Sequence, residues 1–365
     1  MRLLSSFCLL FILLACESAP PLQYPHQEGD KSQLTLSVGQ YETDYWPAGF
    51  APFNQGKISA SVQEVVYAER EEMDLRLDFY QTETPKARNP LVILLHPGAF
   101  LTGSKNDPDM RRLAQDLARA GFHCAVVNYR LLGDGLSSAE VITGVLTPRR
   151  FFRQQVYKSL QDVHTAVRFL HAQARERGLD EDRFYLAGYS AGGILSLSYA
   201  LLDDQEAAAY FDLEKTDCLN CLPFVGQEKI GSDRIRAFAS LSGGVFSPSL
   251  AEGAHGPILM MHGTEDRIVP IEQGLPFQRF IRDYEAADLD LDSSDFEIEE
   301  RWVRLFANLT VPTVAGSRSL FPALGTDTRF ICLQGVDHGI LSTENPDAHY
   351  QKVRAELSEF FTQYR

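Results

Sequence analysis

The sequence predicts an α/β fold in which one mostly parallel sheet is covered by helices on both faces. From about residue 60 onward, short apolar runs alternate with stretches in which apolar residues have helical spacing. This alternation is typical of strand–helix–strand units. Leu91–Leu95 is a continuous apolar run, as expected for a parallel strand that is buried on both faces. With 365 residues, of which 44% are hydrophobic, the chain has enough apolar material for one large core.

The elements follow from the same pattern, taken in chain order. Strands are expected at residues 62–67, 75–80, 91–95, 125–127, 184–187, 237–241, 258–261 and 330–333. Helices are expected at residues 110–120, 156–174, 191–202 and 350–364. The first two of these eight strands are expected to form an antiparallel hairpin. The long connections at 131–153, 203–235 and 276–315 are expected to form a pocket rim or a lid, because such insertions usually do so at the edge of a sheet.

The N-terminus has the pattern of a targeting signal. Arg2 precedes the apolar run Leu3–Leu14, which is shorter than the roughly 20 residues that a transmembrane helix needs. The run ends at Ala15 and Cys16 and resembles a bacterial lipoprotein signal, whose cysteine is lipidated; an ordinary signal peptide is the alternative. We therefore expect a signal peptide at 1–15, a tether at 16–59 and a catalytic domain at 60–365. A lipid on Cys16 implies extracytoplasmic anchoring to a bacterial membrane.

Charge and cysteine content narrow the set of partners. The formal net charge of −15 argues against nucleic acid, whose phosphates it would repel. Cys218 and Cys221 form a C-x-x-C motif. Outside the cytoplasm we expect these two cysteines to form a local disulfide. A zinc site is not expected, because a single C-x-x-C lacks the second pair of ligands that zinc needs. Cys124 and Cys332 lie in strand-like runs and are expected to be buried free thiols. The composition leaves the oligomeric state open.

An acidic segment at residues 283–300 is the one candidate for a metal site. Asp288, Asp290, Asp292 and Glu299 match positions 1, 3, 5 and 12 of a calcium-binding loop. Ser293 stands where that loop needs glycine. A solvated acidic loop is therefore the preferred interpretation, and no metal is expected.

Ser190 is the candidate nucleophile. Gly188–Gly192 has the pattern G-x-S-x-G, with a strand before it and a helix of small residues after it. In this context the serine lies on a strained turn that projects its hydroxyl at the edge of the sheet, and glycines keep side chains out of the turn. The alternative, a purely structural turn, does not account for the flanking elements.

Three further motifs follow expected strands in the order that a Ser-Asp-His triad needs. His96–Phe100 is similar to the His-Gly-Gly loop of many esterases, in which backbone N–H groups bind an oxyanion. His262–Pro270 resembles an acid loop in which Asp266 orients a histidine, with Glu265 as the competing carboxylate. His338 lies on a loop after the last strand, and among the nine histidines it alone has both that context and the right chain order.

With these four motifs in order, residues 60–365 resemble the α/β-hydrolase superfamily. Within that superfamily they are most similar to secreted esterases. The resemblance implies an eight-stranded sheet with loop insertions at its C-terminal edge and a serine hydrolase without a cofactor. Its oxyanion donors map to the N–H groups of Gly98, Ala99 and Ala191. His96, Tyr129, Arg130 and Asp162 match scaffold positions of such relatives rather than catalytic ones.

The favoured activity is carboxylic ester hydrolysis through an acyl-enzyme. The expected substrates are small-molecule or carbohydrate esters with short acyl groups. Tyr189 and Phe100 either line a compact pocket or belong to the core. Two alternatives stay open: a serine peptidase of the same fold, and a catalytically silent binding protein.

Overall fold

A computed structural model describes most of the predicted catalytic domain. The described residues are 61–71, 73–132, 134, 148–203, 207, 211, 219, 222–226, 233–245, 256–271, 315–316, 328–341 and 347–364. The expected lipidation site Cys16, the domain boundaries near residues 15 and 59, the Cys218–Cys221 disulfide and the acidic segment 283–300 lie outside them. Within the described part, no helix combines the length and apolar character needed to cross a membrane.

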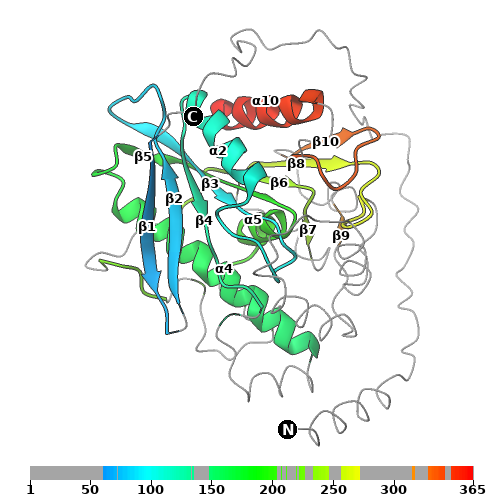
Figure 1. Ribbon diagram of the computed structural model, residues 1–365, viewed down its shortest axis with the longest axis horizontal. Coiled ribbons are helices and arrows are strands. Elements are labelled where there is room, and N and C mark those ends of the chain that lie inside the picture. Colours follow the sequence, from blue (N-terminus) through cyan, green and yellow to red (C-terminus); the bar gives the residue numbers. More distant parts are fainter. Residues whose placement is uncertain are drawn as a thin grey trace, which may run out of the picture. The chain divides into compact units, whose positions relative to one another are not determined.

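An eight-stranded mixed sheet forms the centre of the fold, as predicted (Figure 1). Its spatial order is β1-β2-β4-β3-β5-β6-β8-β10. β1 and β2 are antiparallel to each other, β2 is antiparallel to β4, and the remaining pairs are parallel. The strands are β1 (Val62–Glu69), β2 (Asp74–Tyr80), β3 (Asn89–Leu95), β4 (His123–Val127), β5 (Leu179–Tyr189), β6 (Ala237–Leu241), β8 (Ile258–Gly263) and β10 (Thr328–Leu333).

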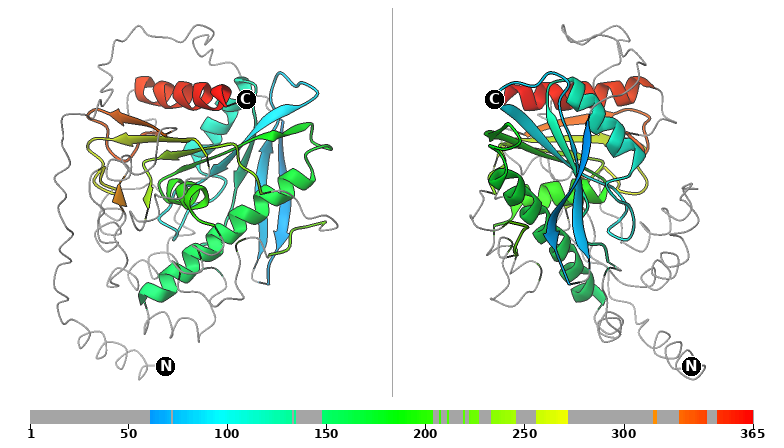
Figure 2. Two further views of the ribbon diagram at one scale, coloured as in Figure 1. Left: turned by 180° about the vertical axis from the view of Figure 1, so that it is seen from behind. Right: turned by 60° about the vertical axis from the view of Figure 1, so that its left-hand side comes forward.

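Within the described residues, helices cover both faces of the sheet (Figures 1 and 2). They are α2 (Pro108–Arg119), α4 (Pro148–Ala172), α5 (Ala191–Leu201) and α10 (Asp347–Gln363). α2 and α10 lie on one face, where Leu113 and Leu357 share a core with Val92 of β3. α4 and α5 lie on the other face (Figure 2). Strand β3 is fully buried from Leu91 to Leu95, because both faces are covered.

The start of α4 and a second, small sheet are among the features that differ from the sequence prediction. α4 begins at Pro148, eight residues before the predicted start at Val156, so the preceding connection is shorter than expected. Proline is well suited to the first turn of a helix, where its missing N–H costs nothing; the prediction had treated it as a loop residue. A second sheet joins β7 (Gly244–Val245) to β9 (Ala315–Gly316), and strands of two residues are too short to show a periodic pattern.

The parallel register brings the motif loops to one edge of the sheet. Leu95 at the end of β3 pairs with Gly188 of β5, and Tyr189 pairs with Leu241 of β6. On the far side, Gly263 of β8 pairs with Leu333 of β10. The chain therefore leaves β3, β5, β6, β8 and β10 at the same edge, which is where α/β sheets hold their ligands.

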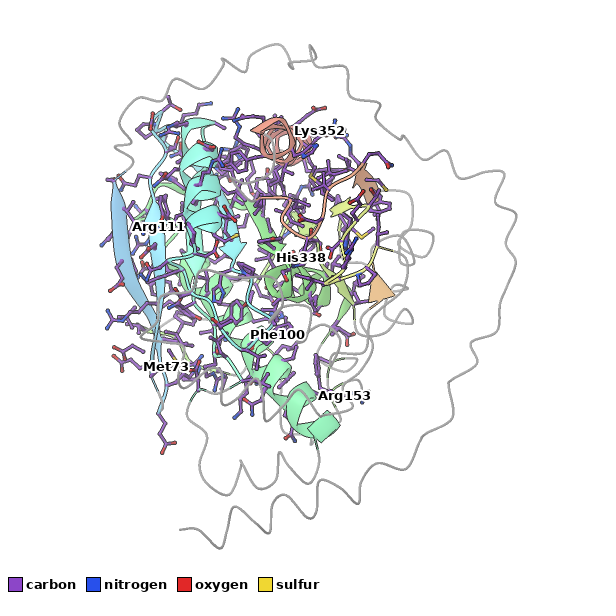
Figure 3. The ribbon with its side chains drawn as sticks, turned by 45° about the vertical axis from the view of Figure 1, so that its right-hand side comes forward. Met73, Phe100, Arg111, Arg153, His338 and Lys352 are labelled. Atoms are coloured by element: carbon purple, nitrogen blue, oxygen red, sulfur yellow. The ribbon has the colours of Figure 1, made fainter. Side chains whose placement is uncertain are left out.

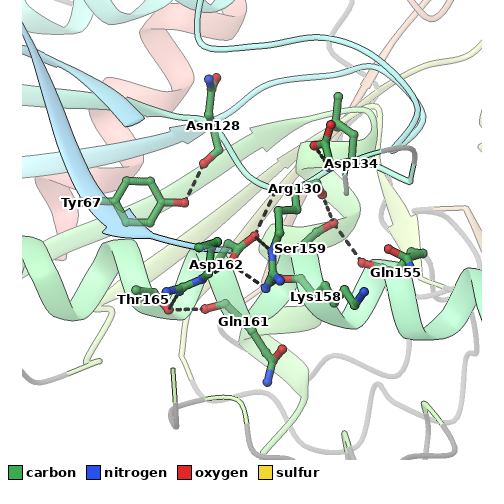
Figure 4. A network of polar contacts seen from close by, with 12 residues as sticks. Tyr67, Asn128, Arg130, Asp134, Gln155, Lys158, Ser159, Gln161, Asp162 and Thr165 are labelled. Carbon is green, nitrogen blue, oxygen red and sulfur yellow. Dashed lines mark hydrogen bonds and ion pairs between the residues drawn. The ribbon is translucent and has the colours of Figure 1, made fainter. Parts of the chain in front are cut away.

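A buried ion-pair network joins Arg130, which follows β4, to α4 (Figure 4). Asp162 of α4 is fully buried. Arg130 donates to its two oxygens from Nη2 and Nε at 2.9 and 2.8 Å, and from its backbone N–H at 3.0 Å. Nε of Arg70 lies 3.5 Å from the same carboxylate. Burial raises the pKa of Asp162, and the charges of the two guanidinium groups offset part of that rise.

Asp162→Asn is expected to lower the free energy of unfolding by roughly 3–5 kcal/mol, because it leaves two largely buried guanidinium groups without a counter-charge. Urea denaturation measures the loss. Asp74→Asn is the control: Asp74 pairs with Arg76 at 3.0 Å on the surface, where both side chains are more than 40% exposed, and should cost less than about 1 kcal/mol. Equal, small losses from both variants would contradict the structural role of the network.

Candidate active site

Ser190 lies on the tight turn between β5 and α5. Its backbone has φ 54° and ψ −116°, a strained conformation for a residue other than glycine. The neighbouring glycines explain how the turn fits. A Cβ on Gly188 would come within 2.0 Å of the Gly192 carbonyl oxygen, and a Cβ on Gly192 within 2.2 Å of the Leu95 carbonyl oxygen. The turn therefore needs glycine at both positions, as the motif predicted.

The structure brings Ser190, His338 and Asp266 together in one hydrogen-bonded chain. His338 Nε2 lies 2.9 Å from Ser190 Oγ, and His338 Nδ1 lies 2.8 Å from Asp266 Oδ2. In Figure 3, His338 lies beside α5, the helix that follows Ser190. A carboxylate only accepts hydrogen bonds, so Nδ1 carries the proton and Nε2 is the acceptor for the serine hydroxyl. This tautomer is the one that a general base needs.

Asp266, and not Glu265, is the carboxylate that contacts His338. Glu265 is exposed, whereas Asp266 is buried. Asp266 Oδ1 accepts the backbone N–H groups of Ile268 at 2.9 Å and Val269 at 2.8 Å. Burial raises the pKa of Asp266, but the charges and hydrogen bonds of His338 and His262 outweigh burial and hold the pKa below its ordinary value. The carboxylate is thus ionised and can stabilise an imidazolium.

His262 is a neighbour of the site that the sequence analysis assigned only to the acid-loop turn. It occupies β8, is fully buried, and places Nε2 3.1 Å from Asp266 Oδ2. The signal was present in the sequence, because His262 precedes Asp266 by four residues across a tight turn. Spacing alone did not reveal that its ring folds back onto the carboxylate.

The loop that carries His338 is held by two hydroxyl groups. Tyr189 donates to the His338 carbonyl oxygen at 2.9 Å, and Ser242 donates to the same oxygen at 3.2 Å. The rings of Tyr189 and His338 also stack, with centroids 5.5 Å apart. Tyr189 is 7% exposed and Phe100 1% exposed. Both aromatic side chains are therefore buried.

The predicted oxyanion loop after β3 includes consecutive residues with positive φ. Gly98 has φ 125° and Ala99 has φ 56°, and a Cβ on Gly98 would come within 2.0 Å of the Thr102 carbonyl oxygen. Within the described residues, the N–H groups of Gly98, Ala99 and Ala191 donate no hydrogen bond. Ala191 is the first residue of α5, where the helix dipole favours negative charge. These three groups remain the candidate oxyanion donors.

His96 holds this loop and does not contact the triad. Its ring stacks on Tyr129 with centroids 4.3 Å apart, and Nδ1–H donates to the Pro97 carbonyl oxygen at 2.7 Å. Tyr129 in turn donates its hydroxyl to the His96 carbonyl oxygen at 2.8 Å. Burial lowers the pKa of His96 to about 4, so the ring is neutral. The geometry agrees with a scaffold role for both residues.

Comparisons with known proteins point to the same fold. The family model described as BD-FAE, of an α/β-hydrolase-type esterase family, matches residues 77–143 and 147–226. Among solved structures, a propionate-bound esterase from the Planctomycetes species Thermogutta terrifontis is 18% identical, with 83% of this chain and 93% of that chain covered and a TM-score of 0.51. Thermogutta terrifontis esterase 2 phosphorylated by paraoxon is 17% identical, with 84% and 95% covered and a TM-score of 0.53.

A butyrate-bound structure of the thermophilic Thermogutta terrifontis esterase is 18% identical, with 83% and 93% covered and a TM-score of 0.51. No protein of curated function matches the sequence. At this level of identity the structural likeness shows the fold. The chain has the α/β-hydrolase fold, which confirms the prediction made from its motifs.

Tyr189→Phe is expected to lower kcat about tenfold with little change in KM, because His338 loses one of the two hydroxyls that fix its carbonyl. Ester turnover by the purified variant measures the effect. Tyr185→Phe is the matched control, since Tyr185 is also on β5 and donates to the Tyr364 carbonyl at 3.2 Å, outside the triad. If both variants lose only stability, the hydroxyl of Tyr189 has no special role in the site.

Proposed function

We propose that this protein is a serine carboxylic ester hydrolase that works through an acyl-enzyme. The observation that carries the proposal is the continuous hydrogen-bonded chain from Ser190 Oγ through His338 to Asp266, with contacts of 2.9 and 2.8 Å. This arrangement activates an otherwise weak nucleophile without a cofactor.

In the first half-reaction Ser190 Oγ attacks the acyl carbon of the ester while its proton moves to His338 Nε2. The resulting imidazolium donates through Nδ1 to the ionised Asp266, which stabilises its charge. The N–H groups of Ala191, Gly98 and Ala99 hold the oxyanion of the tetrahedral intermediate. His338 then gives the proton from Nε2 to the leaving alcohol as the ester bond breaks.

In the second half-reaction water replaces the alcohol. His338 Nε2 accepts a proton from the water, which attacks the acyl carbon. Collapse of the second intermediate breaks the bond to Ser190 Oγ, and the proton returns from Nε2 to the serine. The products are the carboxylic acid and the free enzyme, and all protons are accounted for within the triad.

Ester chemistry is favoured over the two alternatives. The match to the BD-FAE esterase family covers the oxyanion loop and Ser190, and the similar solved structures are described as esterases. A serine peptidase of this fold would use the same triad, so an ester-versus-peptide panel separates the two. A silent binding protein would have no need of an activated serine, and fluorophosphonate labelling separates it from both enzymes.

For the substrate we propose short acyl groups on a carbohydrate or another polar alcohol. The similar esterase structures hold propionate and butyrate, which are short acids. The predicted signal at residues 1–15 and lipid at Cys16 would place the protein outside the cytoplasm on a membrane, where polymeric esters are met. The net charge of −15 favours neutral esters over polyanionic ones.

Ser190→Ala is expected to reduce ester turnover by at least about a thousandfold with little change in stability, because the triad acts as a unit. The rate of nitrophenyl acetate hydrolysis measures it. Ser196→Ala is the matched control, since Ser196 is likewise a buried serine, lies on α5 and donates to the Leu186 carbonyl. Near-wild-type turnover in Ser190→Ala would end the assignment of the nucleophile.

Activity is also expected to fall by at least about a hundredfold from two-carbon to eight-carbon acyl chains, since each methylene that does not fit a small pocket costs roughly 1–3 kcal/mol. A chain-length series of nitrophenyl esters gives the profile from kcat/KM. Activity that rises toward long chains would favour a lipase and reject the short-acyl proposal, while leaving the serine hydrolase intact.

A further inference from the structure

A second histidine contacts the acid of the triad. His262 Nε2 lies 3.1 Å from Asp266 Oδ2 and 2.6 Å from the Val269 carbonyl oxygen. His262 and the Asp266 side chain are both fully shielded from solvent. Water therefore does not compete for either contact.

The acceptors around His262 fix its protonation at Nε2. A carbonyl oxygen and an ionised carboxylate both accept hydrogen bonds and donate none. A bare Nε2 lone pair would face two oxygen lone pairs in a buried site, which is strongly unfavourable. Nε2 therefore carries a proton, which it shares between the Val269 carbonyl and Asp266 Oδ2.

With this contact the Asp266 carboxylate has four donors for its two oxygens. Oδ1 accepts from the backbone N–H groups of Ile268 and Val269, and Oδ2 accepts from His338 Nδ1 and His262 Nε2. Two carboxylate oxygens offer about four acceptor sites, so every site is filled. The same proton of His262 also ties β8 to Val269 and closes the loop that carries Asp266.

We propose that His262 is a positioning residue that holds Asp266 Oδ2 against His338 Nδ1. Its side chain reaches the triad through the contact with Asp266 Oδ2, so its effect on catalysis passes through Asp266. The inference rests on the proposed function, because it assigns His262 to the reaction of that same triad. It adds a fourth side chain to the machinery that the motifs predicted.

Glutamine and asparagine at position 262 separate positioning from packing. The amide nitrogen of glutamine reaches the place of His Nε2, whereas that of asparagine reaches only the place of Nδ1. His262→Gln is expected to keep kcat within about threefold of wild type, and His262→Asn to lower kcat about ten- to a hundredfold with KM little changed, because only glutamine preserves a donor toward a charged acceptor. Nitrophenyl acetate hydrolysis gives both constants, and thermal unfolding checks that the variants are folded.

His171 provides the matched control. It is a buried histidine of α4 whose Nε2 lies 2.9 Å from the Arg234 carbonyl oxygen, and its ring stacks on Phe184. His171→Asn should lower stability and leave kcat unchanged. If His262→Gln and His262→Asn lose kcat equally, or if neither loses it, His262 does not act through its Nε2 proton and the proposal is wrong.

A double-mutant cycle with Asp266→Asn tests the route of the effect. If His262 acts only through the Asp266 carboxylate, His262→Asn should cost nothing further in kcat once Asp266 is replaced. An equal loss in both backgrounds would show an independent packing effect and would overturn the proposal. Failure of the proposed function is a separate outcome: wild-type protein would then hydrolyse no ester and take up no fluorophosphonate.

Discussion

The site depends on one constraint, the shared register of the parallel strands. The strands β3, β5, β6, β8 and β10 all end at one edge of the sheet. The three triad residues and the predicted oxyanion loop, which are far apart in the sequence, therefore lie close together. Their loops need only short, tight turns to bring a hydroxyl, an imidazole and a carboxylate within hydrogen-bonding distance. A slip of one residue in any pair would turn each motif side chain to the opposite face of the sheet. In β3, which is buried on both faces, a slip would force every side chain to repack into a space shaped for another.

The buried acid shows how the fold handles a charge away from water. Desolvation alone would favour the neutral form of Asp266, yet its pKa is lowered by His262 of β8 and by His338 of the loop after β10. Two backbone N–H groups of its own loop donate to the same carboxylate. The buried charge of Asp162 is compensated differently. Two arginines contact its carboxylate, but the effect of burial is larger and its pKa is raised. The first carboxylate is arranged to stabilise a positive charge that appears during a reaction. The second locks two elements of the scaffold together.

Much of this architecture could be predicted from the sequence because its signals are local. Apolar runs predicted the eight strands, and the motifs predicted the loops that carry Ser190, Asp266 and His338. The structure adds contacts that join residues distant in sequence, such as the Tyr189 hydroxyl on the His338 carbonyl. No periodicity in the sequence predicts such contacts, because they depend on how two separate segments approach each other in space. The early start of α4 was missed for a different reason: Pro148 fits a turn and a first helical position equally well, and only packing against the sheet decides.

The close approach of Gly192 to Leu95 bears on how the substrate range of this chain could be altered by protein engineering. The turn of the nucleophile and the strand that carries the oxyanion loop are in direct backbone contact, so a single added methyl group at position 192 would meet the Leu95 oxygen at 2.2 Å. Any rearrangement of one part is therefore transmitted to the other. Mutant libraries directed at this seam would be dominated by inactive members for steric reasons alone. Diversity is better introduced into the long connections at residues 203–235 and 276–315, which contain neither a triad residue nor a candidate oxyanion donor.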